Sequence, residues 1–235
     1  MKLDNAIVFI TGANRGLGLA FAREALARGA RKVYAAARDP ATVTLAGVVP
    51  VKLDVTNPDD VAAAARLAGD VTLLINNAGT AATGAFLAED SIAIAQRHLE
   101  TNVYGPMRLT RAFAPILATN GGGAILNVLS IASWVSGTLL GNYGMSKSAA
   151  WAMTNGSRLE LRDQKTQVLA LHVGFIDTDM TAGLDVPKQS PGSVAKTALD
   201  ALEAGASEVL ADELTRQVHS GLTASPPVYL KAIGE

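Results

Sequence analysis

Tyr143 and Lys147, in the stretch NYGMSK, have the residue types and the spacing of a proton-transfer pair. Four residues apart on a helix, they would share one face, with Cβ atoms about 5–6 Å apart. A free tyrosine titrates near 10, so a tyrosine that exchanges protons at about pH 7–8 needs a pKa lowered by roughly 2–3 units. The ammonium of Lys147 would act in that direction. Because such pairs also occur on many helices by chance, the spacing alone fits a structural role as well.

Ser130 and Asn102 are two further candidates for this chemistry. Ser130 ends the apolar stretch LNVLS, where its hydroxyl could donate to a carbonyl group or could instead form a turn or cap. Asn102 precedes Pro106 by four residues. Proline has no N–H, so the helical hydrogen bond to the Asn102 carbonyl cannot form and that oxygen is left free. Pro106 could also serve only to bend the helix around the core.

The stretch TGANRGLG contains a loop with the glycine spacing of an anion-binding turn. Its glycines are Gly12, Gly16 and Gly18, in the pattern GxxxGxG. The loop follows the first predicted strand and opens the first predicted helix, so backbone N–H groups and the positive end of the helix dipole face the carboxyl end of that strand. A pyrophosphate group would fit there. The alternative is an ordinary glycine-rich turn between a strand and a helix.

The end of the second predicted strand, VYAAARDP, indicates which dinucleotide the loop would hold. NAD-binding folds usually place an acid there to accept from the ribose 2′-hydroxyl. This chain has Ala37 at that place, followed by Arg38. Arg38 and Arg15 of the glycine loop could hold a 2′-phosphate by charge-assisted hydrogen bonds, which predicts NADP(H). Two solvated arginines are the alternative, and Asp39 would oppose a phosphate if it turned inward.

Strands and helices alternate along the chain in a way that would position these residues. The predicted strands are residues 6–10, 32–37, 48–53, 71–76, 124–130, 168–173 and 208–210, and the predicted helices lie near 16–28, 58–68, 90–119, 142–163 and 191–204. Most strands are apolar at consecutive positions, as expected when helices cover both faces. The sequence therefore predicts an α/β fold: one NAD(P)-binding Rossmann-fold domain over residues 1–235, with a doubly wound parallel sheet of about seven strands.

Composition excludes several classes of function. Twenty Lys and Arg nearly cancel 21 Asp and Glu, so no charged surface is expected for nucleic acid or an anionic membrane, and a small molecule is the expected partner. The chain has no cysteine, and its three histidines are far apart in sequence, so no metal site is expected. The first apolar stretch is too short for a signal peptide or a membrane span, and we expect a cytoplasmic protein.

Taken together, these motifs resemble those of the classical short-chain dehydrogenases/reductases over about residues 5–212. The matching segments, in order, are the TGxxxGxG loop with Thr11, Asp54 in LDV, NNAG at 76–79, Asn102 in LETNVYG, Ser130, and Tyr143 with Lys147. The resemblance implies a catalytic tetrad of Asn102, Ser130, Tyr143 and Lys147. It also implies that the free Asn102 carbonyl binds a water that connects the lysine with bulk solvent.

The same resemblance assigns the cofactor contacts. It implies that Asp54 receives the adenine amino group beside Val55, that Asn76 and Gly79 support the ribose and the glycine loop, and that Ile176 and Thr178 contact the carboxamide. The implied cofactor-binding set is Gly12, Asn14, Arg15, Gly16, Leu17, Gly18, Arg38, Asp54, Val55, Asn76, Ala78, Gly79, Tyr143, Lys147, Gly174, Ile176 and Thr178. Asn76 and Asn77 could instead only tie neighbouring strands together. The sequence Val173-Gly174 departs from the Pro-Gly that is frequent in the family.

The expected reaction is reduction of an apolar ketone or aldehyde by NADPH, and its reverse. Ser130 would polarise the carbonyl and Tyr143 would donate the proton. The candidate pocket residues are Ala132, Trp134, Leu139, Leu140, Phe175, Met180 and Leu184, an apolar set. The alternatives are an alcohol dehydrogenase that prefers NAD(H), and a non-catalytic NADP sensor that regulates a protein partner.

A substrate lid, a C-terminal extension and an oligomeric state are also expected. Residues of about 179–192 would form a short substrate lid, and residues of about 212–235 a short C-terminal extension. A homodimer through the helices at 90–119 and 142–163 is expected, with a tetramer possible.

Overall fold

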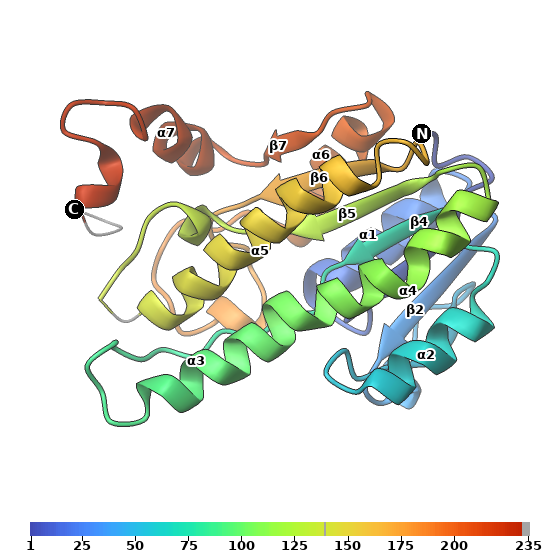
Figure 1. Ribbon diagram of the computed structural model, residues 1–235, viewed down its shortest axis with the longest axis horizontal. Coiled ribbons are helices and arrows are strands. Elements are labelled where there is room, and N and C mark those ends of the chain that lie inside the picture. The colour runs from blue at the N-terminus through green and yellow to red at the C-terminus, as the bar shows by residue number, and fades with distance from the viewer. Residues whose placement is uncertain (139, 232–235) are drawn as a thin grey trace.

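The computed structural model describes residues 1–138 and 140–231, and within them seven parallel strands form one sheet. The strand order is β3-β2-β1-β4-β5-β6-β7 (Figure 1). The strands are β1 (Ile7–Thr11), β2 (Lys32–Ala37), β3 (Val49–Lys52), β4 (Leu73–Asn76), β5 (Ala124–Val128), β6 (Gln167–His172) and β7 (Glu208–Leu210). The order reverses between β1 and β4, which is where doubly wound sheets bind ligands. The predicted fold class is confirmed.

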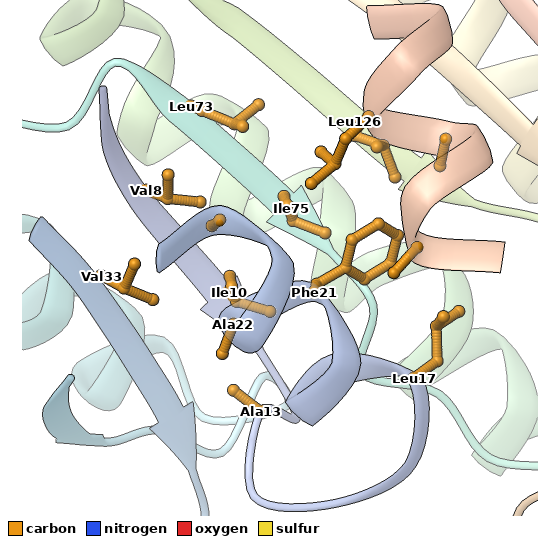
Figure 2. Close-up of a cluster of buried hydrophobic side chains, with 14 of the residues drawn as sticks. Val8, Ile10, Ala13, Leu17, Phe21, Ala22, Val33, Leu73, Ile75 and Leu126 are labelled. Atoms are coloured by element: carbon orange, nitrogen blue, oxygen red, sulfur yellow. The ribbon is translucent and has the colours of Figure 1, made fainter. Parts of the chain in front are cut away.

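Helices cover both faces of this sheet (Figure 1). One face carries α1 (Gly16–Ala27) and α6 (Pro191–Glu203), and the other carries α2 (Pro58–Leu67), α3 (Ser91–Leu99), α4 (Gly105–Thr119) and α5 (Gly141–Glu160). Strand β1 shows why its apolar residues are consecutive: Val8 and Ile10 pack in one core cluster, while Ile7 and Phe9 pack in the cluster on the opposite face. In Figure 2, Phe21 of α1 lies over the sheet in the first of these clusters.

The predicted helix at 90–119 is interrupted by a π-helical segment, Glu100–Tyr104, between α3 and α4. The sequence reason is Pro106. It cannot donate the hydrogen bond that the Asn102 carbonyl would accept in a regular α-helix, and wider π turns often occur where that ladder is broken near a functional site. The absence of this bond was predicted, whereas the π segment was not.

The C-terminal extension contains a helix that the sequence reading did not identify, α7 (Glu213–Gly221). Asp212 caps it by accepting from the Thr215 backbone N–H, at 2.8 Å. The same carboxylate accepts from the Gly174 N–H at 2.7 Å, which joins the extension to the end of β6. Asp212 is a residue type that often precedes a helix, so it was the signal in the sequence that could have predicted α7. No helix in the described part of the chain is long and apolar enough to cross a membrane.

The glycine loop has the backbone that its sequence predicts. Gly12 and Gly16 have positive φ angles of 64° and 54°, a region in which residues with a Cβ are strained. Gly18 is needed for close packing, because a Cβ there would lie 2.1 Å from the Gly12 carbonyl oxygen. Helix α1 can therefore begin directly over the end of β1.

Replacing Gly18 should destabilise the fold through this contact. We expect Gly18→Ala to lower the free energy of unfolding by about 1–3 kcal/mol, because the helix must move away from the strand. Gly156→Ala in α5 is the matched control: a Cβ there meets nothing within 4 Å, so the change should stabilise the protein by about 0.5–1 kcal/mol. Urea unfolding followed by circular dichroism measures both. Equal stability of the Gly18→Ala variant and the wild type would contradict the packing argument.

Candidate active site

The candidate catalytic residues gather at the carboxyl edge of the sheet. Ser130 follows β5, Tyr143 and Lys147 lie in the first two turns of α5, and Asn102 lies in the π-helical segment. The glycine loop leaves β1 at the same edge. The structure therefore brings together residues that are up to 45 positions apart in the tetrad, from 102 to 147.

Tyr143 and Lys147 share one face of α5, as their spacing predicts. The Nζ atom of Lys147 lies 5.8 Å from the centroid of the Tyr143 ring. Lys147 is buried and donates to the Val128 carbonyl at 2.8 Å. This bond fastens α5 to the end of β5, and hence fixes the tyrosine relative to Ser130, two residues beyond Val128.

The protonation of this pair differs from the sequence expectation. Burial raises the pKa of Tyr143 to about 12, and hydrogen bonding with Ser130 only partly offsets this effect. Burial also lowers the pKa of Lys147 to about 8. The lowered tyrosine pKa expected from the sequence is thus not found in the protein without its cofactor, where burial of the phenol has the largest effect. A phenol that stays protonated is suited to giving a proton to a developing alkoxide.

Ser130 is held rigidly beside this pair. The backbone N–H groups of its neighbours Leu129 and Ile131 donate to the carbonyls of Leu171 and Val173, at 2.7 and 3.0 Å. The Ser130 hydroxyl oxygen accepts from the Ala132 N–H at 3.1 Å and caps a short 3₁₀ turn. Both the catalytic and the capping roles considered from the sequence are thus compatible with its position, because the hydroxyl hydrogen remains available to a carbonyl.

The side chain of Asn102 holds two segments together. Its Oδ1 accepts from the Thr80 N–H and its Nδ2 donates to the Thr80 carbonyl, both at 2.9 Å. Nδ2 also donates to the Ser146 hydroxyl at 2.9 Å, and that hydroxyl donates to the Tyr143 carbonyl at 2.7 Å. Asn102 therefore ties the segment after β4 to the helix that carries the tyrosine.

A small polar cavity adjoins Asn102, Pro106 and Lys147. Its volume is about 10 Å³, which is close to the space that one water molecule needs. The Oδ1 atom of Asn76, which also lines the cavity, is buried without a hydrogen-bond partner. The cavity fits the water that the family resemblance implies at this place.

The glycine loop fits a pyrophosphate. Helix α1 has no side-chain cap at Arg15 and no acidic residue in its first turn, so its first N–H groups can bind an anion. Asn77 supports the loop by donating to the carbonyls of Thr11 and Gly12, at 2.8 and 3.2 Å. The loop support assigned to Asn76 is thus provided by its neighbour Asn77. Asn76 donates to Asn127 at 2.8 Å and ties β4 to β5, the alternative role considered for it.

The arginines expected to select NADP(H) are both exposed. Arg15 pairs with Asp179 of the lid at 2.7 Å, and Asn14 donates to Thr42 at 3.1 Å. The Asp39 side chain caps the following turn by accepting from the Ala41 N–H at 3.0 Å. The roles of Arg38 and Asp39 toward a 2′-phosphate stay predictions.

The remaining predicted cofactor contacts lie at the same edge of the sheet, and their roles stay predictions. Asp54 uses Oδ1 locally to accept from Thr56, and Val55 packs against Gly105. Leu17 is buried in the core, so its backbone is the part available to a ligand. Gly79 lies against the Asn102 side chain, and Thr178 against Gly16. The others in the set are Ala78, Gly174 and Ile176.

Backbone hydrogen bonds join the two ends of the segment predicted as a substrate lid, and side chains between these ends are exposed. The Asp177 N–H donates to the Gln189 carbonyl at 2.9 Å, and the Gln189 N–H donates to the Phe175 carbonyl at 2.8 Å. The lid therefore begins a few residues earlier than 179, and α6 begins at Pro191 within the predicted range of 179–192. Met180 and Leu184 are exposed, and their contact with a substrate stays a prediction.

The other candidate substrate residues are distributed around Ser130 and α5. Ala132 is buried beside Ser130, Leu140 and Phe175 are partly exposed, and Leu139 lies outside the described residues. Trp134 stacks on His172 at 3.9 Å between ring centroids, and its indole nitrogen is buried. Most of this ring therefore belongs to an aromatic cluster with Trp151 and His219, and its contact with a substrate stays a prediction.

Two histidines that the sequence reading considered only as metal ligands contact the tetrad. His172 lies 3.3 Å from the Ser130 carbonyl through Nδ1. The His98 ring lies edge-on to the Tyr143 ring, with centroids 6.0 Å apart. A signal for His98 was its position one helical turn before Asn102, on the same face.

Comparison with known proteins identifies the family of this chain. The family model of the short chain dehydrogenases matches residues 6–189. An NADP-dependent 3-hydroxy acid dehydrogenase from Schizosaccharomyces pombe is 31% identical, over 94% of this chain and 95% of the relative. A galactitol 2-dehydrogenase (L-tagatose-forming) from Cereibacter sphaeroides is 33% identical, over 77% of this chain and 75% of the relative.

A solved structure is similar over almost the whole chain. It is a short chain dehydrogenase from Burkholderia cenocepacia J2315 in complex with NADP, with 40% identity, a TM-score of 0.92 and 96% of each chain covered. The chain therefore belongs to the short-chain dehydrogenase family, whose members are NAD(P)-dependent oxidoreductases that act on CH–OH and C=O groups.

Proposed function

We propose that this protein reduces ketones or aldehydes to alcohols with NADPH, and catalyses the reverse oxidation. The observation that carries the proposal is the placement of Tyr143, Lys147 and Ser130 at one edge of the sheet, beside a glycine loop that fits a pyrophosphate. The complete tetrad favours an enzyme over a non-catalytic NADP sensor. The NADP-bound structure of a 40% identical relative supports the choice of cofactor.

Three side chains of the protein have separate roles in the proposed reaction. NADPH, when bound, supplies a hydride from its nicotinamide ring. The Ser130 hydroxyl donates a hydrogen bond to the substrate oxygen and so polarises the carbonyl group. The Tyr143 phenol gives its proton to that oxygen as negative charge develops there. The Lys147 ammonium then returns a proton to the deprotonated tyrosine. Lys147 in turn regains a proton from bulk solvent through the cavity beside Asn102.

The cofactor would lie along the carboxyl edge of the sheet. The N–H groups at the start of α1 would hold the pyrophosphate, and Arg15 with Arg38 would hold the 2′-phosphate. One arginine at about 4 Å from a phosphate gains on the order of 4 kcal/mol at an effective dielectric constant near 20, before desolvation is subtracted. The Asp179 carboxylate competes for Arg15, so the net gain is smaller.

The substrate is proposed to be largely apolar near the reacting carbon. The candidate wall of the site includes Ala132, Leu140 and Phe175, together with Met180 and Leu184 of the lid. The names of the relatives include a 3-hydroxy acid and a polyol as substrates, so a polar group at the far end of the molecule is compatible with this wall.

A homodimer is the proposed assembly. The helices expected to form its interface are α3, α4 and α5 (Figure 1). Each of them exposes at least one large apolar side chain. These side chains are Ile92, Met107, Met145 and Leu159. Burying them against a second copy would remove apolar surface from water.

Tyr143→Phe tests the reaction directly. Loss of the proton donor should reduce the turnover number by roughly 10²–10⁴-fold, because general acid catalysis contributes about that much. NADPH consumption is measured against a panel of aryl ketones, ketoesters and aldehydes, and NADPH binding by fluorescence shows that the variant is folded. Turnover equal to that of the wild type would exclude Tyr143 as the acid.

The double variant Ala37→Asp/Arg38→Ala tests the cofactor preference. A carboxylate in place of a cation should weaken binding of the 2′-phosphate by about 1.5–3 kcal/mol, so the NADPH to NADH ratio of kcat/KM should fall roughly 10- to 100-fold. Arg31→Asp, which makes the same total change in charge at an exposed arginine just before the opposite end of β2, is the charge-matched control. An unchanged ratio in the double variant would rule out this pair as the selector.

The pH dependence tests the role of Lys147. Its pKa of about 8 means that it is an ammonium below pH 8 and a neutral amine above. Proton supply to Tyr143 requires the ammonium, so kcat/KM for reduction should fall above that pH, by up to tenfold per pH unit. In Lys147→Arg the cation persists above about pH 12, so the fall should shift upward. The same falling limb in both proteins would assign it to another group.

A further inference from the structure

His98 is a histidine buried beside the catalytic tyrosine. It lies in α3, one helical turn before Asn102, and only 1% of its surface is exposed. Helices α3 and α5 lie side by side (Figure 1). The ring of His98 meets the ring of Tyr143 edge-on, at an interplanar angle of 76°. The mechanism given above uses no part of this residue.

The tautomer of His98 follows from its hydrogen bond. The Ala82 backbone N–H points at Nε2, with the two nitrogens 2.9 Å apart. A backbone N–H can only donate, so Nε2 must be the unprotonated nitrogen and the ring proton must lie on Nδ1. The Nδ1 atom of His98 is buried and has no hydrogen-bond partner. Burial lowers the pKa of His98, and the Arg97 charge acts in the same direction. The ring is therefore a neutral acceptor.

His98 and Asn102 act on the same segment. Asn102 binds both the N–H and the carbonyl of Thr80, and His98 binds the N–H of Ala82, from successive turns of one helical face. The segment then continues to Phe86, whose ring lies on Gly141 at the start of α5: a Cβ on that glycine would be 2.5 Å from it. The placement of residues 80–86 thus determines what packs on the first turn of α5.

We propose that His98 is a positioning residue for Tyr143. By accepting from the Ala82 N–H it fixes the 80–86 segment, which packs on the first turn of α5, the turn that carries the phenol. This proposal rests on the proposed function, because it takes Tyr143 as the proton donor. The residue acts through the tyrosine that it contacts and through the segment beside it.

Two substitutions separate the hydrogen bond from packing. His98→Phe keeps a ring against Tyr143 and removes the acceptor, which leaves the Ala82 N–H buried and unpaired. His98→Gln removes the ring and places an amide oxygen near the position of Nε2, where it can accept. We expect kcat to fall about tenfold in His98→Phe and to stay within about threefold in His98→Gln, because small displacements of a catalytic group lower the rate. NADPH affinity should remain within about twofold in both.

Two measurements judge the contact independently of turnover. Long-range ¹H–¹⁵N spectra of the protein, which has three histidines, should show His98 as the Nδ1–H tautomer, assigned by its loss in His98→Gln. Amide hydrogen exchange should show Ala82 protected in the wild type and in His98→Gln, and unprotected in His98→Phe. His219→Phe, at an exposed histidine of α7, should leave the protection of Ala82 unchanged.

The outcomes are distinguishable. An Nε2–H tautomer, or a His98→Phe protein that keeps both Ala82 protection and its kcat, overturns the proposal. A kcat that is kept in His98→Phe and lost in His98→Gln means that the ring serves only packing, and equal losses in the two variants mean that the acceptor does not account for the effect; either result also overturns the proposal. If the wild type reduces no carbonyl substrate, the proposed function fails, while tautomer and exchange still decide whether His98 holds the segment.

Discussion

A lysine ammonium taken out of water needs an acceptor, and Lys147 finds one in the Val128 carbonyl at 2.8 Å. This hydrogen bond crosses from the middle of α5 to the end of β5, so it sets the position of Tyr143, one turn earlier on the helix, relative to Ser130, two residues beyond the strand. The same burial that makes the bond necessary lowers the pKa of Lys147 and raises that of Tyr143. Structure and acid–base properties therefore have one physical origin.

The opposite side of the tyrosine is organised by the helix that carries Asn102. Pro106 removes one hydrogen-bond donor from that helix, and a π-helical segment occurs where the regular ladder is broken. The side chains of His98 and Asn102 extend from this helix to the backbone of residues 80–82. A defect in one helix and two polar side chains thus connect the segment after β4 with the start of α5.

The cofactor edge uses the backbone more than side chains. Gly18 lets α1 approach β1, and the uncapped start of α1 leaves N–H groups for an anion. The exposed side chains at this edge have partners within the protein: Asp39 accepts from the Ala41 N–H of its own turn, and Arg15 pairs with Asp179. Exposed charge pairs are individually weak, so this edge can exchange partners when a ligand arrives.

The sequence by itself determined the elements that depend on local patterns. Consecutive apolar residues predicted the seven strands, the glycine spacing predicted the loop after β1, and four-residue spacing placed Tyr143 and Lys147 on one face of a helix. Tertiary structure decided what depends on burial and on partners distant in sequence. The pKa of Tyr143 rises because neighbouring elements exclude water, a quantity that spacing along one helix does not contain. Three features depend on which segments meet in space. They are the different hydrogen bonds of Asn76 and Asn77, the capping of α7 by Asp212, and the contact of His98 with Tyr143.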